Sequence, residues 1–443
     1  GKNRQGVYLP HYGGLFQGGY MKVKVYPCKL SGTAVVPASK SYAHRALICA
    51  ALADGESKVE CADMNDDIRA TIRAVTALGA KVKYSEGILT VNGITGRVKE
   101  DIVIDCGESG STLRFIIPVA LTLCDGYVRF VGGGKLGERP LGEYFSVFDS
   151  QGIYYRNNSG KDGLDLTVRG DLIADDFELE GNISSQFVSG LLLAAPGLAY
   201  DSTITLSKPL ESKDYVRITM DVMGRYGVVA YYDSGARKFT VYGGQKFNSA
   251  PYSEQAYKVE GDWSQAAFFY VARALGHDID IKGVNSMSVQ GDKVVADMLG
   301  MVKAVAPGRM LTLDVKNVPD IVPALSLACA LRKGGTHIVN AGRLRIKECD
   351  RLHATAEGLN ALGARVKEGK DDMFFDGVDG LKGGVQLPDY HDHRMVMTFA
   401  IAATVCENPV IITGAESVSK SYPAFFNDFE KLGGKYEILG SEV

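Results

Sequence analysis

Two kinds of hydrophobic segment alternate along the chain. The first kind is almost entirely apolar, as in 191–199 (LLLAAPGLA) and 395–405 (MVMTFAIAATV). The second kind is amphipathic: Ile68, Ile72 and Val75 recur at helical spacing before a glycine and a short stretch of alternating apolar and polar residues. A helix that is apolar all round has to be buried, whereas an amphipathic helix is buried on one face only. The pattern therefore predicts an α/β protein in which helices pack inside and strands surround them.

The two kinds of segment recur with a period of roughly 70 residues. The expected apolar helices begin near Ser41, Gly110, Ser184, Asp262, Pro319 and His391. The expected amphipathic helices begin near Asp66, Arg139, Lys213, Asp292, Asp350 and Tyr422. Successive starts lie 57 to 79 residues apart, and the two series run in parallel. We therefore predict six repeats, each with two helices and several strands, of which the fourth is degenerate around 296–305.

The composition restricts what this protein can bind. The 443 residues are enough for two or three domains with cores of their own. Lysine and arginine number 49 against 52 aspartates and glutamates, whereas a nucleic-acid-binding protein would show a large basic excess. The apolar segments are shorter than the roughly 20 residues that span a bilayer, and the chain does not open with a signal-peptide pattern. We therefore expect no nucleic-acid partner and no membrane.

The cysteines and the first twenty residues add two expectations. Eight cysteines are scattered without a CxxC motif, which favours a reducing cytoplasm and gives no zinc or disulfide framework. Residues 1–20 are rich in glycine, tyrosine and polar residues and show no periodicity. We interpret 1–20 as a leader outside the fold, and expect the first strand to begin at Met21.

Basic residues gather where the predicted helices begin. The segment 345–351 (RIKECDR) places five charged side chains in seven positions at such a start. Serine and aspartate are good helix caps, but a cation at a helix N-terminus opposes the helix dipole by roughly 0.3 kcal/mol or more. A single cation could simply pair with a neighbouring carboxylate, but several in the same context indicate a site for a ligand with several anionic groups. The cations in this setting are Lys40, Arg45, Arg114, Arg139, Lys347, Arg351 and Arg394.

Eight segments resemble, in the same order, motifs of the 3-phosphoshikimate 1-carboxyvinyltransferases, also called EPSP synthases. They are PASKSYAHRAL (37–47), GESGSTLRF (107–115), GERPLG (137–142), ISSQF (183–187), VPD (318–320), RIKECDR (345–351), DHRMVM (392–397) and SKSYPAFF (419–426). The resemblance runs along 21–443 and implies the enolpyruvyl transferase fold, a two-domain inside-out α/β barrel with the active site in the cleft between the domains. One domain would consist of 21–36 and 258–443, the other of 37–257, with three repeats in each.

The resemblance also implies the reaction and its partners. The enolpyruvyl group of phosphoenolpyruvate would pass to the 5-hydroxyl of shikimate 3-phosphate, with release of phosphate and without a cofactor. This step (EC 2.5.1.19) belongs to the shikimate pathway, which leads to chorismate and the aromatic amino acids. Two phosphates and two carboxylates would meet in one site, which agrees with the many cations. A monomer acting on two small molecules is expected.

The resemblance assigns binding roles to residues that match the family's motifs. Residues expected to bind shikimate 3-phosphate are Lys40, Ser41, Arg45, Ser184, Ser185, Gln186, Ser212, Tyr215, Asp320, Arg343 and Lys347. Residues expected to bind phosphoenolpyruvate are Lys40, Gly110, Ser111, Arg139, Gln186, Arg351, Arg394 and Lys420. Arg343 stands where many members carry asparagine, and Ser111 stands where threonine is common.

The expected catalytic residues are Asp320, Glu348, Lys40, Lys347 and His393. The resemblance makes Asp320 the general base and gives Glu348 and Lys347 the proton transfers at the methylene carbon and the bridging oxygen. His393 would hydrogen-bond near the reacting centre. The spacing within RIKECDR further predicts that Lys347 and Arg351 share one helical face and meet an anion together. Asp350 would be the N-cap or an orienting partner.

Two alternatives stay open at this point. The sister enolpyruvyl transferase that acts on UDP-N-acetylglucosamine usually carries a reactive cysteine about where Gly134 stands, and no cysteine lies between 125 and 328. A non-catalytic anion-binding protein on the same repeat would not need an acid and a base such as Glu348 and Asp320. The alternate histidines of 391–393 (HDH) have no third ligand of metal type nearby, so we expect no metal.

Overall fold

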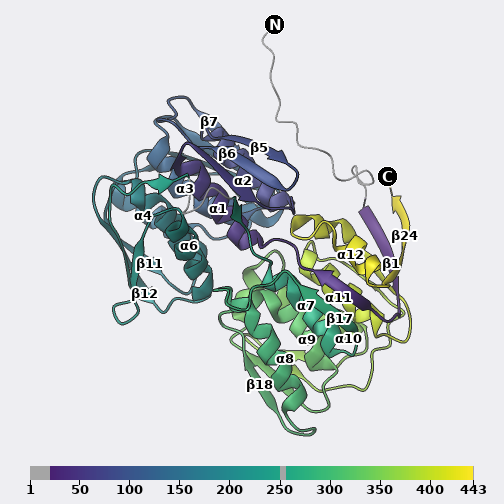
Figure 1. The fold of residues 1–443 in the computed structure, drawn as a ribbon. Helices are drawn as coiled ribbons and strands as arrows, with labels where there is room; N and C mark the ends of the chain where they lie inside the picture. The colour runs from purple at the N-terminus through teal and green to yellow at the C-terminus, as the bar shows by residue number, and fades with distance from the viewer. Residues whose placement is uncertain (1–19, 250–255, 443) are drawn as a thin grey trace. The chain divides into compact units, whose positions relative to one another are not determined.

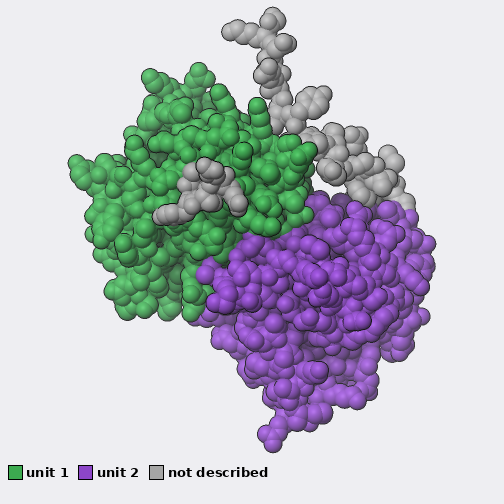
Figure 2. All heavy atoms as spheres, in the orientation of Figure 1, with its two compact units in different colours: residues 1–12, 38–259 green, residues 13–37, 260–443 purple. Residues whose placement is uncertain are grey.

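The computed structural model describes residues 20–249 and 256–442 (Figure 1). Residues 1–19 of the expected leader lie outside the described residues, and strand β1 (Tyr20–Tyr26) begins one residue before Met21. The chain divides into two compact units, coloured separately in Figure 2. Unit 1 is 38–259, and unit 2 combines the described residues up to Pro37 with those from Glu260 onward. The domain boundaries expected from the sequence lie one and two residues before these.

The described part of each unit contains three pairs of α-helices, and each of these begins within three residues of its predicted start. In unit 1 they are α1 (Lys40–Leu52) with α2 (Asp66–Ala77), α3 (Gly110–Leu123) with α4 (Gly142–Gln151), and α5 (Ser185–Ala194) with α6 (Lys213–Arg225). In unit 2 they are α7 (Trp263–Ala274) with α8 (Val295–Ala304), α9 (Val322–Ala330) with α10 (Arg351–Ala361), and α11 (His393–Thr404) with α12 (Phe425–Lys431). Apolar and half-apolar helices alternate as expected: every residue of α9 and α11 is buried, but only five of the thirteen in α6 are.

The described strands of unit 1 form three four-stranded sheets with the same connectivity. Their orders are β16-β4-β6-β5, β7-β8-β10-β9 and β11-β12-β14-β13; in each, the first pair is parallel and the next two pairs are antiparallel. The strands are β4 (Glu56–Glu60), β5 (Lys81–Ser85), β6 (Ile88–Asn92), β7 (Ile102–Asp105), β8 (Val128–Gly132), β9 (Tyr154–Asn157), β10 (Leu164–Arg169), β11 (Asp176–Glu180), β12 (Ser202–Lys208), β13 (Ala230–Asp233), β14 (Lys238–Val241) and β16 (Tyr257–Lys258). A short pair, β3 (Ala53–Asp54) with β15 (Phe247–Asn248), joins two ends of the unit. Because β16 comes from the end of the unit and pairs with β4 from its beginning, the first sheet joins the two ends of unit 1.

Unit 2 repeats this connectivity twice in its described part. The orders are β18-β19-β21-β20 and β22-β23-β1-β24, so strand β1 completes a sheet built from the other end of the chain. The remaining strands of unit 2 are β2 (Ser31–Val35), β17 (Asp278–Lys282), β18 (Leu311–Asp314), β19 (Thr336–Val339), β20 (Val366–Glu368), β21 (Met373–Phe375), β22 (Gln386–Leu387), β23 (Val410–Thr413) and β24 (Lys435–Glu442). In the fourth repeat, the described residues form a two-stranded sheet of β17 and β2. The degenerate pattern around 296–305 lacks the alternating stretch that forms the antiparallel strands of the other repeats.

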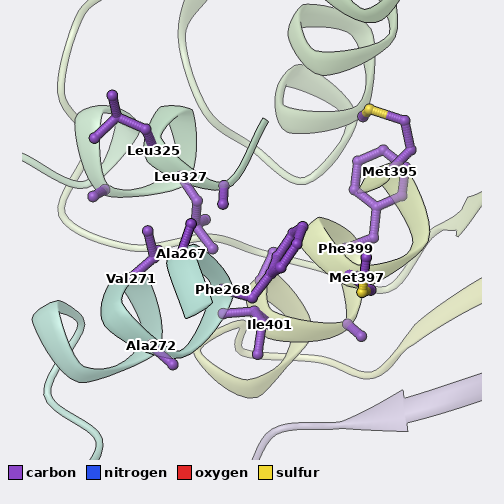
Figure 3. Packing of buried hydrophobic residues seen from close by; sticks show 14 of the residues in the cluster. Ala267, Phe268, Val271, Ala272, Leu325, Leu327, Met395, Met397, Phe399 and Ile401 are labelled. Atoms are coloured by element: carbon purple, nitrogen blue, oxygen red, sulfur yellow. The ribbon is translucent and has the colours of Figure 1, made fainter. Parts of the chain in front are cut away.

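The helices form the core of each unit. In unit 2, Phe268 of α7, Leu325 of α9 and Phe399 of α11 are all buried and pack in one hydrophobic cluster (Figure 3). A Cβ on Gly358 of α10 would overlap the ring of Phe399, so glycine there lets α10 approach α11. Truncating Phe268 to alanine would cost about 3–5 kcal/mol of stability. The strands alternate buried and half-buried or exposed residues, as the pattern BiBiBe of β10 shows, so they cover the helices from outside.

Helix α3 shows how unit 1 tolerates an internal proline. Pro118 has no N–H to donate to the carbonyl of Arg114 four residues earlier. The hydroxyl of Tyr144 in α4 donates to that carbonyl instead, over 2.5 Å. The substitute bond ties α3 to α4 and keeps Arg114 in place near the start of α3. In the described part of the chain, no helix is both long and apolar enough to cross a bilayer.

Candidate active site

A buried arginine connects three helix starts in unit 2. Arg351 is the first residue of α10 and only 1% exposed. Its Nε lies 2.6 Å from Oδ2 of Asp392, its Nη1 lies 2.8 Å from Oδ1 of Asp320, and its Nη2 lies 2.6 Å from Oε2 of Glu348. A guanidinium away from water needs partners for its N–H groups, and these carboxylates supply them. Asp392 caps α11 and Asp320 lies in the 3-10 helix η4 (Pro319–Ile321) before α9, so Arg351 fixes the three helices to one another.

The predicted pairing of Lys347 and Arg351 on one helical face is wrong. Lys347 follows the 3-10 helix η5 (Gly342–Ile346), and α10 begins only at Arg351. The two cations meet through Asp320 instead, because Nζ of Lys347 lies 3.2 Å from the same Oδ1 atom that Arg351 contacts. The prediction for Asp350 is confirmed: it is the N-cap of α10 and accepts a hydrogen bond from the backbone N–H of His353 at 3.0 Å.

Asp320 is surrounded by cations. Besides Lys347 and Arg351, Arg394 of α11 places Nη2 3.4 Å from its Oδ2 and donates from Nη1 to its backbone oxygen at 3.1 Å. Burial alone would raise the pKa of Asp320, but Lys347, Arg394 and Arg351 outweigh burial and hold that pKa well below its usual range. Burial, together with Arg351 and Arg343, lowers the pKa of Lys347. Without substrate, Asp320 is therefore an ionised hydrogen-bond acceptor.

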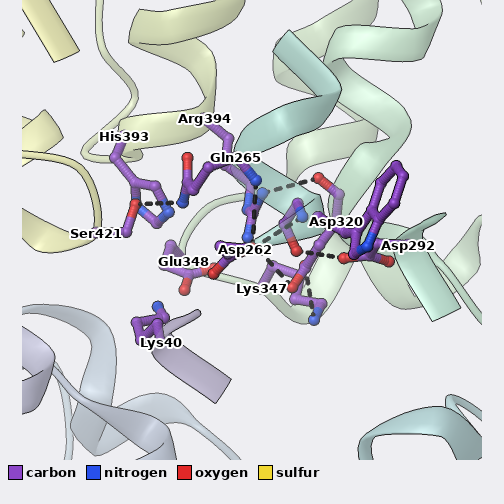
Figure 4. Close-up of polar contacts among 12 residues, drawn as sticks. Lys40, Asp262, Gln265, Asp292, Asp320, Lys347, Glu348, His393, Arg394 and Ser421 are labelled. Atoms are coloured by element: carbon purple, nitrogen blue, oxygen red, sulfur yellow. Dashed lines mark hydrogen bonds and ion pairs between the residues drawn. The ribbon is translucent and has the colours of Figure 1, made fainter. Parts of the chain in front are cut away.

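His393 lies beside one of the partners of Arg351, and Lys420 lies at the end of a 3-10 helix that is held against α7. His393 is the first residue of α11 and fully buried, with Nδ1 3.8 Å from Oδ1 of Asp392. Lys420 ends the 3-10 helix η6 (Ala415–Lys420), and the next residue, Ser421, accepts a hydrogen bond from Nε2 of Gln265 at 3.0 Å (Figure 4). The side chains of Gln265 and Ser421 are buried, so they hold the end of η6 against the start of α7.

In unit 1, a second group of polar side chains lies at helix starts. Lys40, the first residue of α1, places Nζ 2.7 Å from Oδ2 of Asp67 in the first turn of α2. Arg45, one turn further into α1, is 2% exposed and donates to the carbonyls of Ser41 and Tyr215 at 2.8 and 3.0 Å. Its partners are neutral oxygens, and burial lowers the pKa of Arg45 to about 10, which still leaves it charged at neutral pH. Arg45 thus fastens α1 to α6 from inside, while its role as a substrate contact stays a prediction.

Gln186 links two further helix starts of unit 1. Its Oε1 accepts from Nη1 of Arg114 at 2.7 Å, and its Nε2 donates to Oγ of Ser111 at 2.9 Å. Ser184 is the N-cap of α5 and accepts from the backbone N–H of Gln186 at 3.3 Å. The next residue, Ser185, is buried in the first turn. The predicted residues on α3 and α5 therefore lie together.

Gly110 and Ser212 occupy positions with special backbone requirements. Gly110 begins α3 without a positive φ, but a Cβ there would overlap Nη1 of Arg139. Ser212 precedes α6 with φ of 52° and is 1% exposed. The glycine therefore makes room for a cation, and the serine is held in a left-handed conformation that a non-glycine residue rarely adopts.

Several residues of these two groups were not predicted from the sequence. Asp392 could have been predicted as a helix cap from the HDHR segment, in which roles were considered for the histidines and for Arg394 but not for the aspartate. Asp67 and Gln265 gave no comparable signal, because their partners lie far along the chain. Within the described residues, no three histidine, cysteine, aspartate or glutamate side chains are grouped as a metal site would require.

The structural comparisons define a class of protein. The chain resembles an EPSP synthase from Acinetobacter baumannii with a TM-score of 0.75 and 22% identity, over 95% of this chain and all of that one. It resembles the enolpyruvyl transferase NikO from Streptomyces tendae with a TM-score of 0.74 and 17% identity, over 96% and 100% of the two chains. The fold is therefore the two-domain enolpyruvyl transferase fold, an inside-out α/β barrel built from six repeats.

The sequence comparisons give the family within that class. The model of EPSP synthase (3-phosphoshikimate 1-carboxyvinyltransferase) matches residues 26–429. A 3-phosphoshikimate 1-carboxyvinyltransferase of Clostridium beijerinckii is 47% identical over 436 residues, which cover 94% of this chain and 98% of the relative. That of Clostridioides difficile is 44% identical over 437 residues, with the same coverage. The chain belongs to the EPSP synthase family.

Proposed function

We propose that this protein transfers the enolpyruvyl group of phosphoenolpyruvate to the 5-hydroxyl of shikimate 3-phosphate and releases phosphate. The observation that carries this proposal is the contact of Arg351 with both Asp320 and Glu348, in a chain of the EPSP synthase family. The contact brings two carboxylates together beside cations in one buried cluster, and this supports the proposal because enolpyruvyl transfer requires an acid and a base whereas simple anion binding does not. The reaction needs no cofactor.

The anionic groups of the substrates are bound by the cations at the helix starts. Lys40, Arg139, Arg351, Arg394 and Lys420 hold phosphoenolpyruvate, together with Gln186, Ser111 and the backbone of Gly110. Ser184, Ser185, Ser212, Arg45, Tyr215 and Arg343 hold shikimate 3-phosphate, together with Lys40, Ser41, Gln186, Asp320 and Lys347. Truncating one partner of a desolvated ion pair of this kind weakens the complex by about 2–5 kcal/mol.

Asp320 accepts the proton of the 5-hydroxyl as the hydroxyl oxygen attacks the substituted carbon of phosphoenolpyruvate. In the free protein the surrounding cations lower the pKa of Asp320, so its carboxylate is a weak base. Substrate anions that bind Lys347, Arg351 and Arg394 reduce the positive potential at Asp320, so its pKa rises when it has to accept the proton. Glu348 protonates the methylene carbon and later takes that proton back, while Lys347 donates to the bridging oxygen as phosphate leaves. His393 hydrogen-bonds beside the reacting atoms.

The same proposal places the protein in the cytoplasm as a monomer. All eight cysteines are free, and seven of them are buried. Burial raises the pKa of Cys61 and Cys329 to about 12, so these thiols are unreactive at neutral pH. A set of unpaired thiols suits a reducing compartment.

The roles of the acid and the base are tested by Asp320→Ala and Glu348→Gln. Each variant should fold and bind substrate, yet lose about two to four orders of magnitude in kcat, the usual contribution of acid–base groups. Glu407→Gln, on an exposed loop after α11, is the matched control and should turn over like the wild type. Near wild-type turnover in both site variants would refute the assignment.

A further inference from the structure

A buried arginine of unit 1 has no counter-charge. Arg45 lies in the second turn of α1 and is 2% exposed. Among the described residues, no carboxylate lies within ion-pair distance of its guanidinium, and all of its hydrogen bonds go to neutral oxygens. Arg351 of unit 2 is also buried but contacts three carboxylates. Because a buried charge without a counter-charge is costly, the surroundings of Arg45 have to serve something besides packing.

Four neutral oxygens from three helices hold the guanidinium. Nε donates to Oγ1 of Thr219 in α6 at 2.6 Å, and Nη1 donates to the carbonyl of Ser41 in α1 at 2.8 Å. Nη2 donates to the carbonyl of Tyr215 in α6 at 3.0 Å and to Oγ of Ser189 in α5 at 3.4 Å. These contacts fix the plane of the guanidinium and use four of its five N–H groups, so within the described residues one N–H of Nη1 is left for a ligand.

Thr219 makes the shortest of these contacts. Its side chain is fully buried, and its hydroxyl lies 2.8 Å from Oγ of Ser189 and 3.1 Å from the carbonyl of Tyr215, to either of which it can donate. The hydroxyl can therefore accept the bond from Arg45 while its own proton holds it in place. The ring of Phe115 in α3 adds a further neutral partner, with its centroid 4.6 Å from Cζ of Arg45. All these groups orient the cation, and none of them neutralises it.

Neutral partners matter because of the ligand that Arg45 would meet. A carboxylate in place of Thr219 would hold the guanidinium as firmly, but an anionic ligand would then compete with that carboxylate for the positive charge. Neutral oxygens leave the charge to the ligand. A side chain that is already oriented also loses little conformational freedom when the ligand binds. The arrangement therefore suits a cation whose counter-charge is a bound anion.

We propose that Thr219 is a positioning residue that, together with Ser189, holds Arg45 ready for an anionic group of shikimate 3-phosphate without neutralising its charge. The bound substrate then supplies the counter-charge that the chain does not. This inference rests on the proposed function, because that proposal assigns Arg45 to shikimate 3-phosphate.

The alternative is that Thr219 only fastens α6 to α1. Its loss would then lower stability and weaken both substrates alike, whether or not residue 45 carries a charge. The two explanations differ in which substrate is affected and in their dependence on Arg45.

The first test replaces Thr219 by valine, which has nearly the same shape but cannot accept a hydrogen bond. Isothermal titration calorimetry of the whole chain with shikimate 3-phosphate measures Kd, and initial rates of phosphate release give KM for each substrate. We expect Kd and KM for shikimate 3-phosphate to rise roughly five- to thirtyfold, because a hydrogen bond to a charged group is lost. KM for phosphoenolpyruvate and kcat should change little.

Two variants control this measurement. Thr219→Ser keeps the hydroxyl and should bind shikimate 3-phosphate like the wild type. Thr122→Val removes another helical hydroxyl of unit 1, which donates to the carbonyl of Val119 within α3 at 2.8 Å. It should leave Kd and both KM values unchanged.

The second test asks whether Thr219 acts through Arg45 and whether its neutrality matters. Arg45→Met should weaken binding of shikimate 3-phosphate, and adding Thr219→Val to it should weaken binding no further, because the two residues act as one unit. Thr219→Asp and Thr219→Asn have side chains of similar shape but different charge. The aspartate variant should bind shikimate 3-phosphate more weakly than the asparagine variant, although its carboxylate holds Arg45 more firmly. If a variant at Thr219 does not fold, Ser189→Ala, which removes an acceptor of Nη2, takes its place in the comparison with Arg45→Met.

Unchanged affinity in Thr219→Val, equal weakening of both substrates, or the same weakening with and without Arg45 would overturn the inference. An aspartate variant that binds as tightly as the asparagine variant would also overturn it. A wild type that binds shikimate 3-phosphate without turnover refutes the proposed function alone, whereas a wild type that does not bind it overturns both.

Discussion

At the residue scale, Gly110 shows how a single missing side chain shapes the site. A Cβ at this position would overlap the guanidinium of Arg139, and the backbone has no positive φ that would demand glycine. The motif resemblance makes Gly110 one of the residues expected to bind phosphoenolpyruvate, and its missing side chain leaves a space above the backbone. In the structure, the residue that occupies it is a cation proposed to bind that ligand.

The substitution Gly110→Ala should therefore displace Arg139 without destabilising the fold. KM for phosphoenolpyruvate should rise several-fold, KM for shikimate 3-phosphate should stay nearly constant, and the melting temperature should barely change. Alanine also has the higher helix propensity, by about 1 kcal/mol in a helix interior. Gly142→Ala at the start of α4 is the matched control, because its Cβ would meet open space, and it should leave both KM values unchanged. A fall in melting temperature with no selective effect on phosphoenolpyruvate would contradict this account.

At the element scale, two aspartates cap α10 and α11, but the loss of one should cost far more stability than the loss of the other. Asp350 caps α10 with a side chain 39% exposed, and Asp392 caps α11 with a side chain fully buried. Asp392 also pairs with Nε of Arg351. Removing an exposed cap costs about 1 kcal/mol. Removing one partner of a buried ion pair costs about 3–5 kcal/mol, since the other charge is left without compensation.

We therefore expect Asp392→Ala to lower the free energy of unfolding by several times as much as Asp350→Ala. Urea denaturation followed by circular dichroism measures both variants under the same conditions. Asp392→Asn should recover part of the loss, because an amide oxygen can still cap α11, although it cannot neutralise Arg351. Equal losses in the two alanine variants would show that Arg351 does not depend on Asp392.

Much of this element structure could be predicted from the sequence, because it is local. Asp350 as a cap and the start of every helix follow from capping chemistry and from hydrophobic spacing within about ten residues. The geometry of Lys347 could not be predicted in this way. Charges in RIKECDR have helical spacing, but Lys347 pairs with Asp320, which lies 27 positions earlier, and the helix starts only after it. The pairing of Lys40 with Asp67 escaped prediction for the same reason.

At the scale of the whole molecule, the repeat explains both the fold and its closure. The first sheet of unit 1 is completed by β16 from the end of that unit, and the last sheet of unit 2 is completed by β1 from the other end of the described chain. The other three described four-stranded sheets are built from strands that are consecutive along the chain. The hydrophobic pattern predicts the repeat, since it is periodic. The pattern does not predict which strand completes a sheet, because several strands with the same alternation of apolar and polar residues could pair with the same sheet edge.

The central claim is that this fold and these charged clusters perform enolpyruvyl transfer between two anionic substrates. The most direct measurement is phosphate release by the purified protein with phosphoenolpyruvate and shikimate 3-phosphate together, and with each alone. We predict that phosphate is released only when both substrates are present. One phosphate should be released for each 5-enolpyruvylshikimate 3-phosphate formed. Replacing shikimate 3-phosphate by UDP-N-acetylglucosamine should give none. Release from phosphoenolpyruvate alone, or no release with both substrates, would contradict the account.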